Sequence, residues 1–306
     1  MTRRIRTYTE VGESGGGDIL AQVGAQAARV AQRLSLIDHV ILIASGKGGV
    51  GKSLVSANVA AALAAAGRRI GVLDADLNGP STAAMLGAVR APLRVTAAGV
   101  EPASTSTGCR VMSMDLLLAS PDAPVRWREP DVAGFVWQST LETGALRELL
   151  ADTAWGQLDY LIIDLPPGTD RIARLLGLIA RPAALLLVTT PAPAATAVVA
   201  RSVTLAREAG IDDVALVSNM DGYTCPTCGA PAPLFSAGGG AALAATSGVP
   251  LWATIPFDPA LGRATDAGEP LVITRPEQPA AVALRALAET VERHVRARSQ
   301  DVEFAP

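Results

Sequence analysis

Short apolar runs alternate with amphipathic stretches along most of this chain. The apolar runs favour β-strands at residues 39–44, 69–73, 109–114, 159–163, 184–189, 214–218 and 251–255. Apolar spacing predicts helices at residues 18–34, 53–66, 141–151, 195–209, 237–247 and 279–297. Nearly continuous apolar strands separated by helices are typical of a parallel sheet that helices cover on both faces. The pattern therefore predicts a single α/β domain with a mostly parallel twisted sheet.

Polar and irregular segments set the expected boundaries. Residues 1–35 combine a Gly-rich flexible leader with the first helix, residues 36–298 form the expected folded domain, and residues 299–306 form a frayed tail. Residues 87–108 are rich in small side chains and predict a loop with a short β excursion. Residues 119–140 match no element, and their role stays open.

Composition argues against several classes of protein. The chain is 49% hydrophobic, but its most apolar stretch, residues 183–190, is too short to span a bilayer. The basic N-terminus is not followed by the apolar region of a secretory signal. The net charge is −3 and no stretch is strongly basic, which argues against nucleic acid as the main partner. We therefore expect a cytoplasmic protein with neither a membrane nor a nucleic acid as its partner.

Lysine is confined to one glycine-rich loop. The chain has only two lysines, Lys47 and Lys52, and its other basic side chains are arginines, apart from two histidines. Both lysines lie in Ser45-Gly-Lys-Gly-Gly-Val-Gly-Lys-Ser53, between a predicted strand and a predicted helix. A compact ammonium group can follow a phosphate oxygen where the wider guanidinium group of arginine does not fit. The confinement of lysine therefore indicates a phosphate-binding loop.

The loop has the Gly-x-x-x-x-Gly-Lys-Ser pattern of a P-loop. Its backbone N–H groups and the N-terminus of the next helix would hold the phosphates of ATP. Lys52 would reach the β- and γ-phosphates, and the hydroxyl of Ser53 would coordinate Mg²⁺. The expected nucleotide-binding residues of the loop are Gly46, Lys47, Gly48, Gly49, Val50, Gly51, Lys52, Ser53 and Leu54.

Three carboxylates are predicted at the ends of strands beside this loop. Asp74 and Asp76 follow the strand at residues 69–73, and Asp164 follows the strand at residues 159–163. Carboxylates in this position can hold the coordination shell of Mg²⁺ next to a phosphate loop. A single strand-end aspartate could be a cap or a turn residue, but three together favour a Mg²⁺-dependent ATPase.

A Cys-x-x-Cys pair follows the strand predicted at residues 214–218. Cys225 and Cys228 offer two thiolates, which is half of a four-cysteine metal shell, whereas Cys109 lies in an apolar strand and is expected in the core. A tetrahedral thiolate site therefore needs a second copy of the chain. A bridging [4Fe–4S] cluster, a bridging Zn²⁺ ion and a dithiol redox pair all fit this spacing.

The additional lysine narrows the class of ATPase. Lys47-Gly-Gly-Val-Gly-Lys-Ser53 resembles the deviant Walker A motif of the dimeric ATPases that include MinD, ParA and the nitrogenase iron protein. The resemblance implies that Lys47 reaches across a dimer interface to the partner's nucleotide. It further implies that Asp76 activates the attacking water, that Asp74 supports the metal shell, and that the backbone of Gly168 senses the γ-phosphate.

Further segments resemble the Mrp/Nbp35 family of ATP-binding iron–sulfur cluster carriers over roughly residues 36–275. They are Asp74-Ala-Asp-Leu-Asn-Gly-Pro-Ser81, Leu158-Asp-Tyr-Leu-Ile-Ile-Asp-Leu-Pro-Pro-Gly-Thr169, Asn219-Met220, Cys225-Pro-Thr-Cys228, Gly238-Gly-Gly240 and Ile255-Pro-Phe-Asp-Pro259. The resemblance implies a homodimer that holds a [4Fe–4S] cluster between paired cysteines, hydrolyses ATP slowly and passes the cluster to apo iron–sulfur proteins. It also implies that Asn219 and Pro256 lie at the adenine, and that Lys47, Lys52, Asp76 and Asp164 take part in hydrolysis.

The chain departs from the family pattern at two places. Asp170 follows Thr169 directly, where the family has an additional Gly or Ser, so the switch loop is shorter. Trp127-Arg-Glu-Pro130 replaces Trp-Arg-Gly-Pro, and a longer segment precedes Trp155. Two alternatives to a cluster carrier remain: a positioning ATPase of the MinD/ParA type, in which the cysteine pair would have no purpose, and a zinc-bridged regulatory ATPase or metallochaperone.

Overall fold

The fold contains one large sheet and one small sheet. The computed structural model describes residues 16–88, 93–118, 135–168, 178–179, 182–224, 228, 230–235 and 239–303. Within these residues, the strands of the large sheet are β1 (Ile37–Ala44), β2 (Ile70–Asp74), β5 (Ala103–Ser104), β6 (Arg110–Met112), β7 (Leu158–Asp164), β8 (Ala184–Thr189), β9 (Val214–Thr224), β10 (Pro231–Ala232) and β11 (Leu251–Phe257). The small sheet pairs β3 (Val95–Thr96) with β4 (Gly99–Val100).

Helices connect and flank these strands. In the described part of the chain they are α2 (Gly16–Leu34), α3 (Lys52–Ala65), α4 (Thr82–Met85), α5 (Phe135–Asp152), α7 (Thr196–Glu208), α8 (Gly239–Ser247), α9 (Pro259–Asp266), α10 (Leu271–Thr274) and α11 (Pro279–Glu303). Two short 3-10 helices, η1 (Met114–Leu117) and η2 (Pro193–Ala195), lie between them.

The large sheet is mostly parallel, as the sequence predicts. Its order is β10-β9-β8-β1-β7-β2-β6-β5, and β11 also pairs with β9. All pairings among β11, β9, β8, β1, β7, β2 and β6 are parallel, whereas β10 and β5 run antiparallel to their neighbours. Parallel strands end at a common edge, so the segments that follow β1, β2, β7 and β9 meet at one edge of the sheet.

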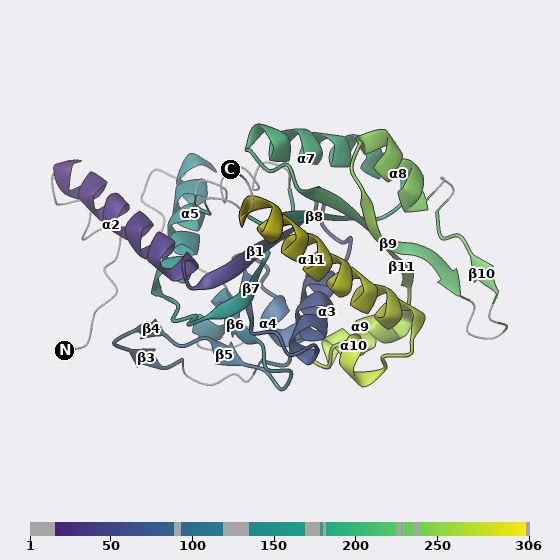
Figure 1. Cartoon of the computed structure of the whole chain (residues 1–306), viewed down its shortest axis with the longest axis horizontal. Coiled ribbons are helices and arrows are strands. Elements are labelled where there is room, and N and C mark those ends of the chain that lie inside the picture. The colour runs from purple at the N-terminus through teal and green to yellow at the C-terminus, as the bar shows by residue number, and fades with distance from the viewer. Residues whose placement is uncertain are drawn as a thin grey trace.

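Both faces of the sheet are buried. Alternate side chains of β1 enter two different cores: Ile41 and Ile43 belong to one, and Leu42 and Ala44 belong to the other. The first core is closed by α3 and α11, which lie side by side (Figure 1). The second core receives apolar side chains from α2, α5, α7 and α8. This two-sided burial explains why the strands are continuously apolar.

Helix α11 is a core helix along most of its length. Its Leu284, Leu287 and Val291 are fully buried in the first core, against α3 and β11. The buried apolar face of α11 is therefore used for packing within the fold. Among the described residues, no helix is both long enough and apolar enough to cross a membrane.

The predicted elements are present, with differences at their ends. The predicted helix at residues 141–151 begins earlier, at Phe135, and the predicted strand at 214–218 continues to Thr224. The strand predicted at 109–114 is reduced to three residues. The β excursion expected within residues 87–108 forms the short strands β3, β4 and β5. Residues 119–134 of the unassigned segment lie outside the described residues.

Several short elements have no counterpart in the sequence prediction. They are α4, α9, α10 and β10, each of eight residues or fewer. Elements of this length contain too few turns for an apolar period to emerge. The N-terminal helix, by contrast, agrees with the prediction, and it packs against α5. Its Arg33 donates to the carbonyl oxygens of Ala98 and Ala151, which ties α2 to the small sheet and to α5.

Candidate nucleotide site and cysteine hairpin

The phosphate loop joins β1 to α3 at the carboxyl edge of the sheet. Its geometry requires glycine at several positions. A Cβ on Gly46 would lie 2.1 Å from Cγ1 of Val198, and Gly51 has φ 81°, in the left-handed region that other residues rarely adopt. Helix α3 begins directly afterwards at Lys52, so its free N–H groups face the loop.

Lys52 and Asp164 form a buried ion pair in the centre of the site. The Nζ atom of Lys52 lies 2.7 Å from Oδ1 of Asp164, and both side chains are almost completely buried. Lys52 also donates to Oγ of Ser53 at 3.2 Å. The ammonium group is therefore held at the end of β7, next to the hydroxyl that the sequence assigns to Mg²⁺.

Two hydroxyl groups, which the sequence did not predict at this site, also bind the carboxylate of Asp164. Ser56 Oγ donates to Oδ1 of Asp164 at 2.7 Å, and Thr82 Oγ1 donates to Oδ2 at 2.8 Å. Ser56 lies one turn beyond Lys52 on α3, and Thr82 begins α4. Both carboxylate oxygens of Asp164 thus have partners, so a buried charge is stabilised on each side.

Asp74 organises the loop that follows β2. Its Oδ1 accepts from the backbone N–H of Asp76 at 3.0 Å, and its Oδ2 accepts from the N–H groups of Ser81 and Thr82 at 2.8 and 2.9 Å. Burial, together with the neighbouring Asp164 carboxylate, raises the pKa of Asp74 to about 7, although the three N–H donors act in the opposite direction. Its carboxyl group thus shapes the loop that presents Asp76.

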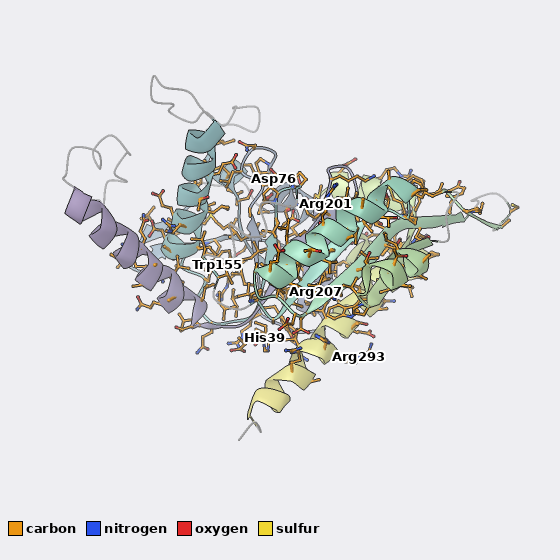
Figure 2. All side chains as sticks on the ribbon, turned by 90° about the horizontal axis from the view of Figure 1, so that it is seen from above. His39, Asp76, Trp155, Arg201, Arg207 and Arg293 are labelled. Atoms are coloured by element: carbon orange, nitrogen blue, oxygen red, sulfur yellow. The ribbon has the colours of Figure 1, made fainter. Side chains whose placement is uncertain are left out.

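Asp76 is the more accessible of the two β2 aspartates. It is half-buried, and its Oδ1 accepts from the N–H of Gly79 at 3.3 Å. Figure 2 shows Asp76 at the side of the molecule opposite His39, which lies near the start of β1. Asp76 therefore stands at the carboxyl edge of the sheet, where a water molecule can reach its carboxylate.

A buried carboxylate of α5 supports the same loop. Oε1 of Glu142 accepts from Nδ2 of Asn78 at 2.7 Å, and the Glu142 residue is only 8% exposed. Asn78 lies two residues after Asp76, so α5 contacts the loop that carries it. Nothing in the sequence pattern predicts this contact, because the two residues are 64 positions apart.

The other residues that the sequence assigns to the nucleotide lie in the phosphate loop or next to it. Lys47, Gly48 and Gly49 are exposed, whereas Val50 is buried. The N–H of Gly168 donates to the carbonyl oxygen of Ser45 at 3.0 Å, which places the end of the β7 segment directly beside the loop. The exposure of Lys47 leaves its ammonium group accessible to another molecule.

Two residues expected at the adenine lie on neighbouring strands. Nδ2 of Asn219, on β9, donates to the carbonyl oxygen of Val50 at 2.9 Å. Pro256 follows Ile255, which pairs with Asn219 in the parallel β9–β11 ladder. Leu54, in the first turn of α3, packs against the first core. The structure therefore brings Asn219 into contact with the phosphate loop and places Pro256 near it.

The cysteine pair follows the outer end of β9. Strand β10 pairs antiparallel with β9, and we call these two strands, together with the chain between them, the cysteine hairpin. Cys228 is exposed, Cys109 is buried in the first core, and Cys225 lies outside the described residues. The core position predicted for Cys109 is confirmed. Within the described residues, no group of three or more metal-ligating side chains is found.

Comparison with known families decides the class of protein. The model described as "ParA: NUBPL iron-transfer P-loop NTPase" matches residues 36–292, which is most of the chain. The chain belongs to this family. The membership confirms the family resemblance found in the sequence, and it confirms a nucleotide-binding P-loop protein.

Relatives of this iron-transfer P-loop NTPase support the same assignment. An iron–sulfur cluster carrier protein of Saccharolobus solfataricus is 38% identical over 259 residues, which cover 84% of each chain. The human cytosolic Fe–S cluster assembly factor NUBP2 is 38% identical over 271 residues, covering 87% of this chain and 96% of NUBP2. The match therefore covers most of the length of both relatives.

Solved structures confirm the fold of the iron-transfer P-loop NTPase. A nucleotide-binding protein of Archaeoglobus fulgidus, in complex with ADP, superposes with a TM-score of 0.69 at 34% identity and covers 83% of this chain and 94% of its own. The cell-division ATPase MinD of Pyrococcus furiosus superposes with a TM-score of 0.57 at 25% identity, covering 84% of this chain and 99% of MinD. The predicted α/β P-loop fold is therefore confirmed.

Proposed function

We propose that this chain is an ATP-binding iron–sulfur cluster carrier of the cytoplasm. Two copies would hold one [4Fe–4S] cluster between their Cys225 and Cys228 thiolates, hydrolyse ATP slowly and pass the cluster to apo iron–sulfur proteins. The observation that carries the proposal is the 38% identity to an iron–sulfur cluster carrier protein over 84% of the chain. The Cys-x-x-Cys pair supplies the thiolates that such a cargo requires.

The residues of the nucleotide site suit a Mg²⁺–ATP substrate. Magnesium prefers oxygen ligands, and Ser53, Asp164 and Asp76 offer a hydroxyl and two carboxylates at the carboxyl edge of the sheet. Bound Mg²⁺ would neutralise charge that develops on the phosphates. Asp74 would act on this shell indirectly, since both of its oxygens already accept backbone N–H bonds.

Lys52 would change partner when ATP binds. Its ammonium group is now neutralised by Asp164 at 2.7 Å. The β- and γ-phosphates carry more negative charge than one carboxylate, and the backbone N–H groups of the loop hold them next to Lys52. Asp164, released from Lys52 but still held by Ser56 and Thr82, becomes available to the metal shell. Asp76 would then orient or deprotonate the attacking water.

In a homodimer, a second copy facing one edge of the sheet would complete both the nucleotide site and the cluster site. The phosphate loop follows β1 and the cysteine pair follows β9, and both strands run parallel to β8 between them. Exposed Lys47 and exposed Cys228 therefore belong to the same edge of the sheet. A second copy facing this edge would give Lys47 the partner's nucleotide to contact, and would add the two thiolates that the cluster lacks.

Anaerobic purification tests the carrier proposal directly. The expected wild-type protein is brown, contains iron and sulfide at about four of each per two chains, and transfers the cluster to an apo-ferredoxin. A Cys225→Ser/Cys228→Ser variant should be colourless and should still bind ATP. A Cys109→Ser variant serves as the matched control, since Cys109 is buried in the core and should leave iron binding unchanged.

The two alternatives give different results in the same experiment. A colourless wild-type protein with about one zinc ion per two chains would replace the carrier with a zinc-bridged ATPase. A positioning ATPase would bind neither iron nor zinc, and its cysteine variant would behave as the wild type. The apolar side chains of α11 are buried in the first core, which argues against this helix as a membrane anchor of the MinD type.

A further inference from the structure

The strand that leads into the cysteine hairpin touches the phosphate loop. Asn219 of β9 is only 3% exposed, and its Nδ2 donates to the carbonyl oxygen of Val50 at 2.9 Å. The packing is tight, because a Cβ on Gly51 would lie 2.2 Å from the same Nδ2 atom. Any rearrangement of the loop around Val50 must therefore displace Asn219 or break this hydrogen bond.

The backbone of β9 changes direction one residue later. Met220 has φ 57°, and it is the one non-glycine residue with a positive φ in the described part of the chain. This left-handed conformation is unfavourable for a residue with a side chain. The β9–β11 register also shifts between Asn219 and Tyr223. Met220 thus marks a break between the inner half of β9, which pairs with β8 and β11, and the outer half, which pairs with β10 and leads to the cysteines.

Asp221 connects this break to α8. Its Oδ2 accepts from Oγ of Ser218 at 2.7 Å and from the backbone N–H of Gly240 at 2.7 Å. Gly240 belongs to the first turn of α8, where N–H groups have no partner within the helix and favour an anionic acceptor. A Cβ on Gly240 would lie 2.3 Å from Cβ of Ser218, so only glycine permits this approach.

The contact lies at the base of the cysteine hairpin. The chain leaves Asp221 through the outer end of β9 and returns through β10 to α8, where Gly240 meets Asp221 again. Strand β10 has only two residues, and the ring of Tyr223 packs against Phe257 at a centroid distance of 6.1 Å. With so short a second strand, the direction of the hairpin depends on how its base is fixed.

We propose that Asp221 is a positioning residue that couples the nucleotide state of the phosphate loop to the cysteine hairpin. The connection runs from Val50 through Asn219 and Met220 to the Asp221 carboxylate, which joins β9 to α8. Phosphate binding rearranges the loop, and the change at Asn219 reorients the base of the hairpin through these contacts. The inference rests on the proposed function, because it gives ATP a means of controlling the site that carries the cluster.

Hydrogen–deuterium exchange of the full chain, with and without Mg²⁺ and the non-hydrolysable ATP analogue AMPPNP, tests the coupling. In the wild type, AMPPNP should slow exchange in residues 46–53 and change exchange in residues 221–224 and 230–235 by about fivefold. In Asp221→Ala, residues 46–53 should respond as before, while the hairpin response should disappear. Asp212→Ala is the control, because Asp212 is exposed just before the same strand, and it should respond as the wild type.

Each of the following results would overturn the proposal. The first is a wild-type hairpin that does not respond to AMPPNP, and the second is an Asp221→Ala hairpin that responds fully. The third is the loss of the response in residues 46–53 of Asp221→Ala, which would assign Asp221 to nucleotide binding instead. If Asp221→Ala does not fold, Ser218→Ala removes one of the two contacts to Oδ2 and should reduce the hairpin response; an unchanged response would also overturn the proposal.

The experiment is independent of the cargo. No iron is present in the exchange measurement, so a chain that bridged zinc instead of a cluster would give the same exchange result. Failure of the carrier proposal appears as absent iron, whereas failure of the coupling appears as an exchange pattern that ignores Asp221.

Discussion

The nucleotide site and the cysteine hairpin lie at the same edge of the sheet, but they are built in opposite ways. In the nucleotide site, Lys52 and Asp164 are buried and each has several partners. In the cysteine hairpin, Cys228 is exposed and the returning strand has two residues. The nucleotide site is preorganised within one chain, whereas the proposed cluster site would be completed by a second copy. This difference in burial suggests that nucleotide binding needs one chain, whereas the proposed cluster binding needs a second copy.

The largest expected effect comes from the buried ion pair. Lys52→Ala should reduce ATP hydrolysis at least about 100-fold, since it removes the charge that faces the phosphates. It should also lower the free energy of unfolding by about 3 kcal/mol, because Asp164 is left as an uncompensated buried charge. Steady-state kinetics and urea denaturation measure the two effects.

An exposed ion pair provides the control for this stability change. Arg69 and Asp159 form a contact of 2.5 Å in which the Arg69 side chain is half-exposed. Arg69→Ala should lower the free energy of unfolding far less than Lys52→Ala, because solvent screens an exposed ion pair, and it should leave hydrolysis unchanged. Equal destabilisation by the two variants would mean that burial does not set the Lys52–Asp164 pair apart from a surface ion pair.

The next effect concerns Lys47, the exposed lysine of the phosphate loop. Lys47→Arg keeps the charge but replaces a compact ammonium with a wide planar group, so ATP hydrolysis should fall about tenfold. The affinity for AMPPNP, measured on the monomer by calorimetry, should stay the same. Wild-type turnover in Lys47→Arg would rule out the contact with the partner's nucleotide.

A smaller effect is expected at the loop that carries Asp76. Glu142→Ala removes the acceptor that holds Asn78 at 2.7 Å, and hydrolysis should slow about threefold as Asp76 becomes less well oriented. KM for ATP should change little. Glu148→Ala, at an exposed position of the same helix, is the matched control; the interpretation fails if both variants slow hydrolysis equally.

A pH dependence is also expected within the buried site. The pKa of Asp74 is raised to about 7 from the ordinary 3.8, so the folded chain binds this proton more tightly than the unfolded chain. The resulting stability is complete below pH 3.8 and is lost as the pH rises through 7. Carbon-13 NMR of the Asp74 carboxyl group should show titration near pH 7; titration near pH 4 would mean that burial and the Asp164 carboxylate do not raise this pKa.

Sequence alone predicts the parts of the site that are contiguous. The residues from Gly46 to Ser53 could be recognised because the loop, its lysines and its flanking elements are adjacent in the chain. Ser56 and Thr82 could not be assigned to Asp164, since three separate segments meet there only after folding. The order of helices and strands could be predicted because the strands are continuous apolar runs, buried on both faces of the sheet, and the helices show apolar spacing.

The outer half of β9 shows a second limit of sequence patterns. The predicted strand ends at residue 218, and the next segment, Asn219-Met-Asp-Gly222, has the polar and glycine residues that are typical of a turn. The chain does turn locally at Met220, but pairing with β10 and β11 carries the strand on to Thr224. Pairing with distant segments overrides the local turn signal at this point, and it places Asp221 against Gly240.

Native mass spectrometry of the anaerobically prepared chain tests most directly whether two copies share one cluster. We predict a species of two chains with one [4Fe–4S] cluster, which dissociates to monomers when Cys225 and Cys228 are both replaced by serine. A cluster bound to a single chain, or a dimer that carries zinc and no iron, would contradict the shared cluster.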